Sequence, residues 1–418
     1  MPVNTPVQTV LLSSGDTVSA MVESQEYYNI SEIGITRLIN LMKDNYTRPR
    51  WRIYTLFFDE SINFEIPNED IKLGGSFNEN YQDGQRRSLT FSLYNESGKY
   101  SPNINMFWGN TRLRLDMGVE LFSGETVWIQ AGIFIVSSAQ DSVSTSEKMV
   151  QITAKDKFSL FEEKTGTLEN TYEIPEGTEI EEVFKTILLT DMGDGNPFDS
   201  KPIIYHSSFK GKKTQATISK SAGESYGSIL LELATQLSAE IFYNSQGYLT
   251  LIPTSETALD VDKPLLYDFV DENGDLSGLD FSFDMSSIIN RIVVIGSSVK
   301  GQVVSAIAVN DDVGSPLCYQ RIGYRTGNII NDSNITTEYL AQERARYELR
   351  KQLIIRSSTS INVLFNPLLS VNNLVAITSE HFNLSHERFL IQSISCPLDY
   401  SGTVSVTISN IKNLPSLV

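Results

Sequence analysis

Short stretches in which apolar and polar residues alternate occupy much of the chain, and three of them occur twice in the same order. The matching segments are 88–95 with 359–366, 134–138 with 389–393, and 150–154 with 404–408. Alternation with a period of two is typical of a strand that buries one face. One such match is weak because alternating strands are common, but three in register predict that a small antiparallel β domain is present twice.

Two segments in the middle of the chain have the spacing of amphipathic helices. Thr178 and Glu181 could form a capping box, and so could Ser221 and Glu224. The apolar stripes behind them are Ile180, Val183, Phe184, Ile187 and Leu188, and then Tyr226, Ile229, Leu230, Leu233, Ala234 and Leu237. Segments 239–243 and 248–252 flank a four-residue loop and predict a hairpin. Helices beside a small sheet indicate an α+β insert.

Two more helices are expected nearer the ends of the chain. The first carries one apolar stripe and is ended by Pro49; its stripe residues are Ile35, Leu38, Ile39 and Met42. The second spans 336–352 and has a narrow stripe made of Ala341, Ala345 and Leu349. A stripe this narrow is typical of a connecting or peripheral helix.

These patterns predict a mainly β fold with an α+β insert, built from two related antiparallel barrel-like domains and two smaller accessory domains. The expected parts are an N-terminal arm and helix at 1–46, a first barrel-like domain at 47–162, the α+β accessory domain at 163–262, a second barrel-like domain at 263–300 and 336–418, and a small insert or accessory domain at 301–335.

Composition and charge narrow the classes of function. The 418 residues are 40% hydrophobic and 20% charged, as in folded proteins. A net charge of -18 disfavours docking on nucleic acid or an anionic membrane, because both require a basic face. No apolar run approaches the roughly 18 residues of a membrane-spanning helix. The N-terminus lacks the basic region and apolar core of a signal peptide, so we expect a chain made and kept in the cytosol unless a larger assembly exports it.

Gly223-Glu-Ser-Tyr-Gly227 matches the GxSxG nucleophile elbow of serine hydrolases. That mechanism needs an exposed serine on a sharp turn and a histidine that takes its proton. A cap at Ser221 would instead place Ser225 in the first turns of a helix, which is the favoured interpretation. Paired carboxylates are uninformative among 51 acidic residues.

Metal-binding patterns fail on their spacing. Asp271-Glu-Asn-Gly-Asp275 begins like a calcium loop, but Leu276 and Ser282 stand where glycine and glutamate are required. A solvated acidic turn is therefore expected there. Asp191-Met-Gly-Asp-Gly-Asn196 fails similarly and leaves room only for an incidental ion.

The histidines and cysteines give no recognisable site. His381 and His386 are five residues apart without a third ligand nearby, and His206 is isolated. Cys318 and Cys396 form no CxxC-type pair, so neither a zinc site nor a disulfide framework is expected. Buried structural thiols are the favoured interpretation, although the sequence leaves a Cys–His nucleophile pair open.

The densest basic clusters are Arg86-Arg87 and Lys210-Gly-Lys-Lys213, which are too small for a nucleic-acid footprint and are predicted to be solvated turns. The three tryptophans lie in or beside strand patterns and are expected in the core: Trp51, Trp108 and Trp128. We therefore predict no catalytic, cofactor-binding or metal-binding residue. The chain fits a structural or binding protein better than an enzyme.

Segments spread over most of residues 50–410 resemble, in order, the baseplate central hub family of tailed phages. They are 86–102, 132–136 and 150–157 in the first repeat, 226–234 and 239–253 in the insert, 290–296 with Asn310, Ser315, Pro316 and Gly323, and finally 366–369 and 389–406. The resemblance rests on the number and order of these segments, none of which is a catalytic signature. Residues 1–46 match nothing in that family.

The resemblance implies a homotrimer in which two tube domains per chain form a ring of six similar units. That ring would join a hexameric tail tube, or a tube-initiator protein, to a trimeric spike or tail lysin. The tape measure protein and other baseplate proteins are further implied partners. The implied location is the tail baseplate of a virion assembled in the host cytoplasm, with DNA only in passage and no membrane span.

The duplication in the sequence is consistent with the same number of units, because two copies of the domain in each of three chains make six. An acidic wall would also let DNA slide without sticking. Two alternatives belong to other classes: a tail-associated cell-wall hydrolase using Ser225 or an acidic pair, and a receptor- or carbohydrate-binding tail module, which would need clustered exposed aromatic residues.

Overall fold

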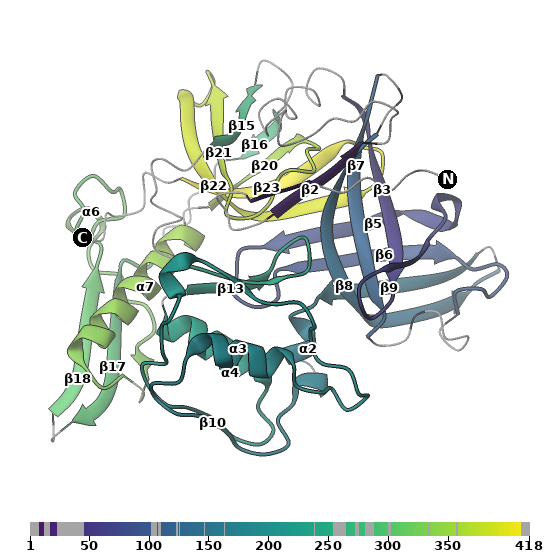
Figure 1. Cartoon of the computed structure of the whole chain (residues 1–418). Helices are drawn as coiled ribbons and strands as arrows, with labels where there is room; N and C mark the ends of the chain where they lie inside the picture. Colours follow the sequence, from purple (N-terminus) through teal and green to yellow (C-terminus); the bar gives the residue numbers. More distant parts are fainter. Residues whose placement is uncertain are drawn as a thin grey trace.

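The computed structural model describes residues 8–11, 17–22, 46–101, 107, 110–122, 124, 126–145, 147–162, 164–237, 239–253, 265–271, 276–280, 288–299, 302–332, 335–356 and 358–410. A large β-sheet, a helix-bearing α+β unit and a small sheet with one long helix lie beside one another (Figure 1). The helix expected around Ile35 and the side chain of Trp108 lie outside the described residues.

The large sheet contains the strands of both repeats. The first repeat supplies β3 (Tyr46–Leu56), β4 (Ile62–Glu65), β5 (Ile71–Asn80), β6 (Arg87–Tyr94), β7 (Arg112–Leu121), β8 (Thr126–Val143) and β9 (Lys148–Asp156). The second supplies β15 (Leu265–Val270), β16 (Leu276–Asp280), β20 (Ser358–Leu364), β21 (Leu374–Ser379), β22 (Leu384–Leu398) and β23 (Thr403–Asn410). The hairpin of β1 (Gln8–Leu11) and β2 (Thr17–Val22) adds to β8 through β2.

The predicted duplication is present in the pairing of the strands. The order β5-β6-β9-β8-β7 in the first repeat corresponds to β16-β20-β23-β22-β21 in the second. Leu89 pairs with Ala154 in the first repeat, and Thr359 pairs with Ile408 at the equivalent place in the second. All these strand pairs are antiparallel.

A β-bulge marks the same position in both repeats. The register of β8 against β9 shifts between Val136 and Ser138, and that of β22 against β23 shifts between Ile391 and Ser393. A bulge adds one residue to one strand and is a specific feature of a sheet. The second bulge lies 255 residues after the first, counted from Val136 to Ile391. This recurrence supports an internal repeat independently of sequence likeness.

The first segment match needs a correction of one residue. If Ser88 is aligned with Thr359, then Leu89, which is buried, becomes the counterpart of Ser360, which is exposed. The strand pairing aligns Leu89 with Thr359 instead, and both of these side chains are buried. A one-residue slip moves every side chain to the other face of a strand, so burial fixes the alignment.

The two repeats form one continuous sheet. The C-terminal half of β22 pairs antiparallel with β5, from Ser393 opposite Asn80 to Leu398 opposite Gly75. The main strand path runs from β16 to β4, and the pairing of the described strands closes no barrel. The mainly β fold with an α+β insert is thus confirmed. No closed barrel is found among the described strands: those of the two repeats form one open sheet, and buried residues from both repeats belong to one hydrophobic core.

The α+β unit follows β9 and packs around its own core. Its elements are α2 (Ser159–Glu162), η3 (Lys164–Gly166), β10 (Tyr172–Ile174), α3 (Ile180–Leu188), β11 (Ile204–Tyr205), η4 (Ser207–Phe209), β12 (Ile218–Lys220), α4 (Tyr226–Gln236), β13 (Ala239–Tyr243) and β14 (Leu249–Pro253). The predicted stripe of α3 is buried, and β13 and β14 form the predicted hairpin. Helix α4 begins after Ser225, four residues beyond the predicted cap at Ser221.

A third unit has a sheet of its own, made of β17 (Arg291–Val299), β18 (Gln302–Val309) and β19 (Ile330–Asn331), with α6 (Tyr319–Ile322) beside it. Helix α7 (Glu338–Arg356) packs on this sheet through the predicted narrow stripe, whose residues are fully buried: Ala341, Ala345 and Leu349. No helix among the described residues is both long and apolar enough to span a bilayer.

Candidate functional site

The loop between β5 and β6, residues 81–86, touches all the other parts of the molecule and is here called the junction loop. The backbone N–H of Tyr81 donates to the carbonyl of Gln392 in the second repeat at 2.7 Å. The N–H of Gly84 donates to the carbonyl of Ile241 in the α+β unit at 2.8 Å. Tyr347 of α7 donates its hydroxyl to Asp83 at 3.3 Å. The loop therefore fixes the units relative to one another.

A buried ion pair lies directly beneath the junction loop. Glu79 and Arg87 are opposite each other on β5 and β6, and Arg87 Nη2 lies 2.6 Å from Glu79 Oε1. Their side chains are only 1% and 3% exposed. Glu79 also accepts from the hydroxyl of Ser370 at 3.0 Å, while Arg87 donates to the carbonyl of Tyr243 at 2.7 Å. One charge pair thus connects the first repeat, the second repeat and the α+β unit.

A second buried pair anchors the α+β unit. Arg86 Nη2 lies 2.8 Å from Glu240 Oε2, and each side chain is 2% exposed. The guanidinium also lies 3.6 Å from the ring centre of Phe242. Burial raises the pKa of Glu240, and the positive charge of Arg86 opposes this rise.

The two basic clusters of the sequence differ in burial: one is buried and the other is exposed. The prediction that Arg86-Arg87 forms a solvated turn is wrong, because both side chains are buried and paired with carboxylates from other elements. The prediction for Lys210-Gly-Lys-Lys213 is confirmed, because these residues are exposed. Arg87 lies in phase with Leu89 and Leu93 on the buried face of β6. The alternating pattern of this strand could therefore have predicted that Arg87 is buried.

Asp156 closes the first repeat onto its own beginning. Its Oδ2 accepts the backbone N–H groups of Arg86 at 2.7 Å and Arg87 at 2.8 Å, and its Oδ1 accepts that of Phe158 at 3.1 Å. Burial raises the pKa of the Asp156 carboxyl to about 6, while these N–H donors limit the rise. The carboxyl thereby holds the start of β6 and the end of β9 together.

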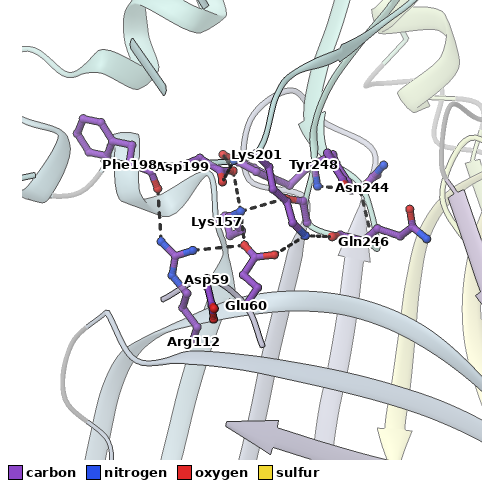
Figure 2. A network of polar contacts seen from close by, with 12 residues as sticks. Asp59, Glu60, Arg112, Lys157, Phe198, Asp199, Lys201, Asn244, Gln246 and Tyr248 are labelled. Carbon is purple, nitrogen blue, oxygen red and sulfur yellow. Dashed lines mark hydrogen bonds and ion pairs between the residues drawn. The ribbon is translucent and has the colours of Figure 1, made fainter. Parts of the chain in front are cut away.

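Three cations converge on Glu60 where the sheet meets the α+β unit (Figure 2). Lys157 and Lys201 each pair with a Glu60 oxygen, and Arg112 Nη1 lies 3.3 Å from Glu60 Oε1. Lys157 also lies 2.6 Å from Asp199 Oδ2. Burial lowers the pKa of Lys157, and the neighbouring carboxylates of Asp199 and Glu60 oppose this. We call these five side chains the Glu60 cluster.

The cluster joins two turns: the one between β3 and β4, which carries Glu60, and the one between β13 and β14. Glu60 adopts a φ of 64°, which is uncommon for a residue with a Cβ, in the turn between β3 and β4. Lys157 and Lys201 also donate to the carbonyls of Gly247, at 3.0 Å, and Gln246, at 2.8 Å, in the β13–β14 turn. Each acid and base of the cluster is held by at least one partner of opposite charge, so the arrangement suits a rigid joint.

The structure places Ser225 at the N-cap of α4, where its Oγ accepts the N–H of Ser228 at 3.1 Å. The histidines make their contacts elsewhere. His206 Nδ1 contacts the Ser208 hydroxyl at 2.8 Å, His386 Nδ1 lies 2.9 Å from Asp268, and His381 packs edge-on against Phe382. The geometry of the elbow mechanism is therefore not met at Ser225.

The remaining candidates have structural surroundings. Asp191 is exposed and accepts hydrogen bonds from the backbone N–H groups of Gly193 and Gly195 in its own turn. Asp271 is described and accepts from Ser379, whereas 272–275 lie outside the described residues. Across the part of the chain that the structure describes, no three His, Cys, Asp or Glu residues are placed to share a metal ion.

The predicted burial of the two cysteines and of two tryptophans is confirmed: Cys318, Cys396, Trp51 and Trp128 are all at most 8% exposed. Cys396 lies within β22 and not in a turn at its end. Burial raises the pKa of its thiol to about 12, so it is protonated and a poor nucleophile near neutral pH.

Comparison with solved structures finds the same fold in phage tails. The 43 kDa tail protein of prophage MuSo2 from Shewanella oneidensis aligns with a TM-score of 0.56 at 14% identity, over 88% of this chain and 100% of that one. A tail protein from Neisseria meningitidis MC58 aligns with a TM-score of 0.59 at 8% identity, over 87% and 99%. A chain of the Francisella PdpA-VgrG complex aligns at 0.52 and 12% identity, over 93% and 57%.

By sequence, no described protein family and no curated protein matches the chain. The structural matches nevertheless cover nearly the whole length of both tail proteins. The chain therefore has the fold of these phage tail proteins, which agrees with the resemblance to the baseplate hub family.

Proposed function

We propose that this chain is a non-enzymatic structural component of a phage or phage-like tail baseplate. In this proposal it is the central hub, a homotrimer whose duplicated β domains form a ring of six similar units. The ring joins a hexameric tail tube to a trimeric spike or lysin and forms part of the DNA channel. The proposed location is accordingly the baseplate of the tail.

The observation that carries this proposal is the duplication of strand order, register and bulge within one chain. Two tube-like units per chain in a trimer offer a hexameric partner six similar contacts. Such an adaptor needs its two repeats held in one fixed relation. The hydrogen bond from Ser370 to Glu79, a residue held in place by Arg87, and the β5–β22 pairing supply that rigidity, because both cross from one repeat to the other.

The titles of the matched structures support the same assignment. Two matches are named tail proteins, and a third match is a chain of a PdpA-VgrG complex. The acidic character of the chain, with a net charge of -18, fits a conduit that must release DNA. The role of Ser225 as a helix cap argues against the form of the wall-hydrolase alternative that uses this serine as its nucleophile.

Native mass spectrometry of the purified full-length chain tests the proposal, alone and mixed with the tube and spike proteins of the same particle. The expected species has three times the 46.7 kDa mass of the chain and binds tube protein in a ratio of three to six. A chain that remains monomeric with both partners present would contradict the hub assignment. Wall digestion that is lost in Ser225→Ala would favour the hydrolase instead.

A further inference from the structure

One edge of the β8–β9 hairpin has no partner near its tip among the strands that the structure describes. Residues Ser138 to Val143 of β8 pair with β9 on one side. On the other side β7 accompanies β8 only as far as Ile135, and the N–H of Val136 makes the last backbone bond, to Thr111. Among the strands that the structure describes, none pairs with this second side of Ser138 to Val143.

The equivalent segment of the second repeat is covered. Counted from the shared bulge, Ser138 to Val143 correspond to Ser393 to Leu398. In that segment β23 lies on one side, and the free side pairs antiparallel with β5 of the first repeat. The molecule thus shows what partner this kind of edge takes, which is strand β5 of the other repeat.

Burial of side chains differs between the two segments in the way this pairing predicts. Leu398 is 2% exposed, whereas its counterpart Val143 is 72% exposed. Ile394 is likewise buried, whereas its counterpart Ala139 is only partly buried. An exposed valine on a strand that pairs on one side only is expected when the strand for its other side belongs to another molecule.

The matching edge lies on β16, at one end of the strand order. Strand β16 pairs with β20 as β5 pairs with β6, so β16 is the counterpart of β5 in the second repeat. It ends the strand order, and no described strand covers its outer side. The edge that β5 offers to β22 is therefore repeated on β16.

We propose that Ser138 to Val143 of one chain pairs antiparallel with β16 of a second copy of this chain. The inference rests on the proposed ring and names its intersubunit contact. Within the chain, Pro397 lies opposite Ser76 and Leu398 opposite Gly75. Transferred to the second edge, this register places Ser142 opposite Asp280 and Val143 opposite Leu279.

The contact is head-to-tail, since one chain contributes its β8 edge and the neighbouring chain its β16 edge. Heterologous contacts of this kind close into a ring when the rotation per subunit divides a full turn. Backbone pairing along a sheet edge supplies the affinity, as in other cases of strand addition. Strands of successive chains would then continue the sheet that β5 and β22 already join within one chain.

Engineered cysteines test the register directly. Residues directly opposite each other in an antiparallel pair have Cα atoms about 4.5–5.5 Å apart, within reach of a disulfide. The full-length variant carrying Ser142→Cys and Asp280→Cys should give covalent dimers and trimers on a non-reducing gel, which dithiothreitol dissolves. The controls are each single variant and Gln140→Cys with Asp280→Cys, which is two residues out of register; these should remain uncrosslinked.

A charge at the edge tests its contribution to assembly. Val143→Lys should weaken self-association at least about tenfold, because lysine on an edge strand opposes pairing. Val313→Lys is the matched control, since Val313 is 64% exposed in a different unit. It should assemble as the unaltered chain does, and circular dichroism should show both variants folded.

The outcomes separate the two proposals. Wild-type trimers with no crosslink in the registered pair and no effect of Val143→Lys would overturn this contact while leaving the hub assignment standing. A chain that is monomeric even with tube and spike proteins overturns both. Crosslinked trimers from the registered pair, with uncrosslinked controls, support both.

Discussion

At the scale of single residues, the molecule uses buried charges as fixed joints. Arg86 and Arg87 are adjacent, yet one pairs with Glu240 of the α+β unit and the other with Glu79 beside the second repeat. Removing one member of such a pair leaves an uncompensated charge in the interior, which is strongly destabilising. These positions should therefore be far more sensitive than the exposed ion pairs of the same sheet.

We expect Arg87→Ala to lower the free energy of unfolding by about 3–5 kcal/mol, because Glu79 is left buried without its cation. Arg48→Ala is the control: its partner is Glu120 at 3.1 Å, but the Arg48 side chain is 51% exposed. The control should lose far less stability, because an ion pair exposed to solvent contributes little to folding. Urea unfolding followed by tryptophan fluorescence measures both, and equal losses would contradict the joint.

A pH dependence follows from Asp156. Because burial raises its pKa in the folded chain to about 6, above the ordinary value of 3.8, protonation of this carboxyl favours the folded state. Its stabilising contribution is complete at low pH and is lost as the pH rises through about 6. Between about pH 7.5 and about pH 5, the wild type should gain about 1 kcal/mol of stability relative to Asp156→Asn.

Urea unfolding of the wild type and of Asp156→Asn at several pH values measures the difference in their stability. Groups that titrate alike in both proteins do not contribute to this difference. A stability difference that does not change across the range would show that Asp156 is already ionised at the lower pH.

At the scale of elements, alternation and stripe patterns predicted most strands and helices. The stripes of α3, α4 and α7 are buried as expected, and the hairpin of β13 and β14 lies where the sequence placed it. The first repeat match slipped by one residue because Thr359 is polar yet buried while Ser360 is polar and exposed. Two small hydroxyl residues in succession carry no information about which face is inside.

Interactions between distant parts of the chain set the limit of prediction. Glu240 and Arg86 are 154 positions apart, so no local pattern pairs them. The sequence likewise does not predict the open sheet. The two repeats are joined by the pairing of β5 with β22, and no local pattern in either strand indicates that they pair with each other. The cap of α4 was misplaced for a local reason: both Ser221 and Ser225 suit an N-cap, and only the turn geometry decides between them.

Helix α4 provides a test of the role of Ser225. Ser225→Ala should cost about 1 kcal/mol of stability through loss of the N-cap, and Ser225→Asp should restore most of it because aspartate also caps helices. Ser221→Ala should change stability by less than about 0.5 kcal/mol, as for most surface substitutions. Thermal unfolding measures all three. No recovery in Ser225→Asp would contradict the capping role.

At the scale of the whole molecule, the chain is acidic and internally duplicated, and both properties suit a ring around a passage for DNA. With a net charge of -18, it should not retain double-stranded DNA at about 0.15 M salt, because tight binding needs several cations on phosphates. Fluorescence anisotropy with a labelled duplex tests this. Submicromolar binding that weakens with salt would indicate a basic lumen and contradict the proposed passage.

The arrangement of the two repeats in the assembled particle is the most direct test of the account. Electron cryo-microscopy of the purified oligomer would show it. We predict three chains around one axis, with first and second repeats alternating at the same radius to give six similar units. A twofold dimer, or a trimer whose two repeats lie at different radii, would contradict the claim that duplication within the chain produces the sixfold ring.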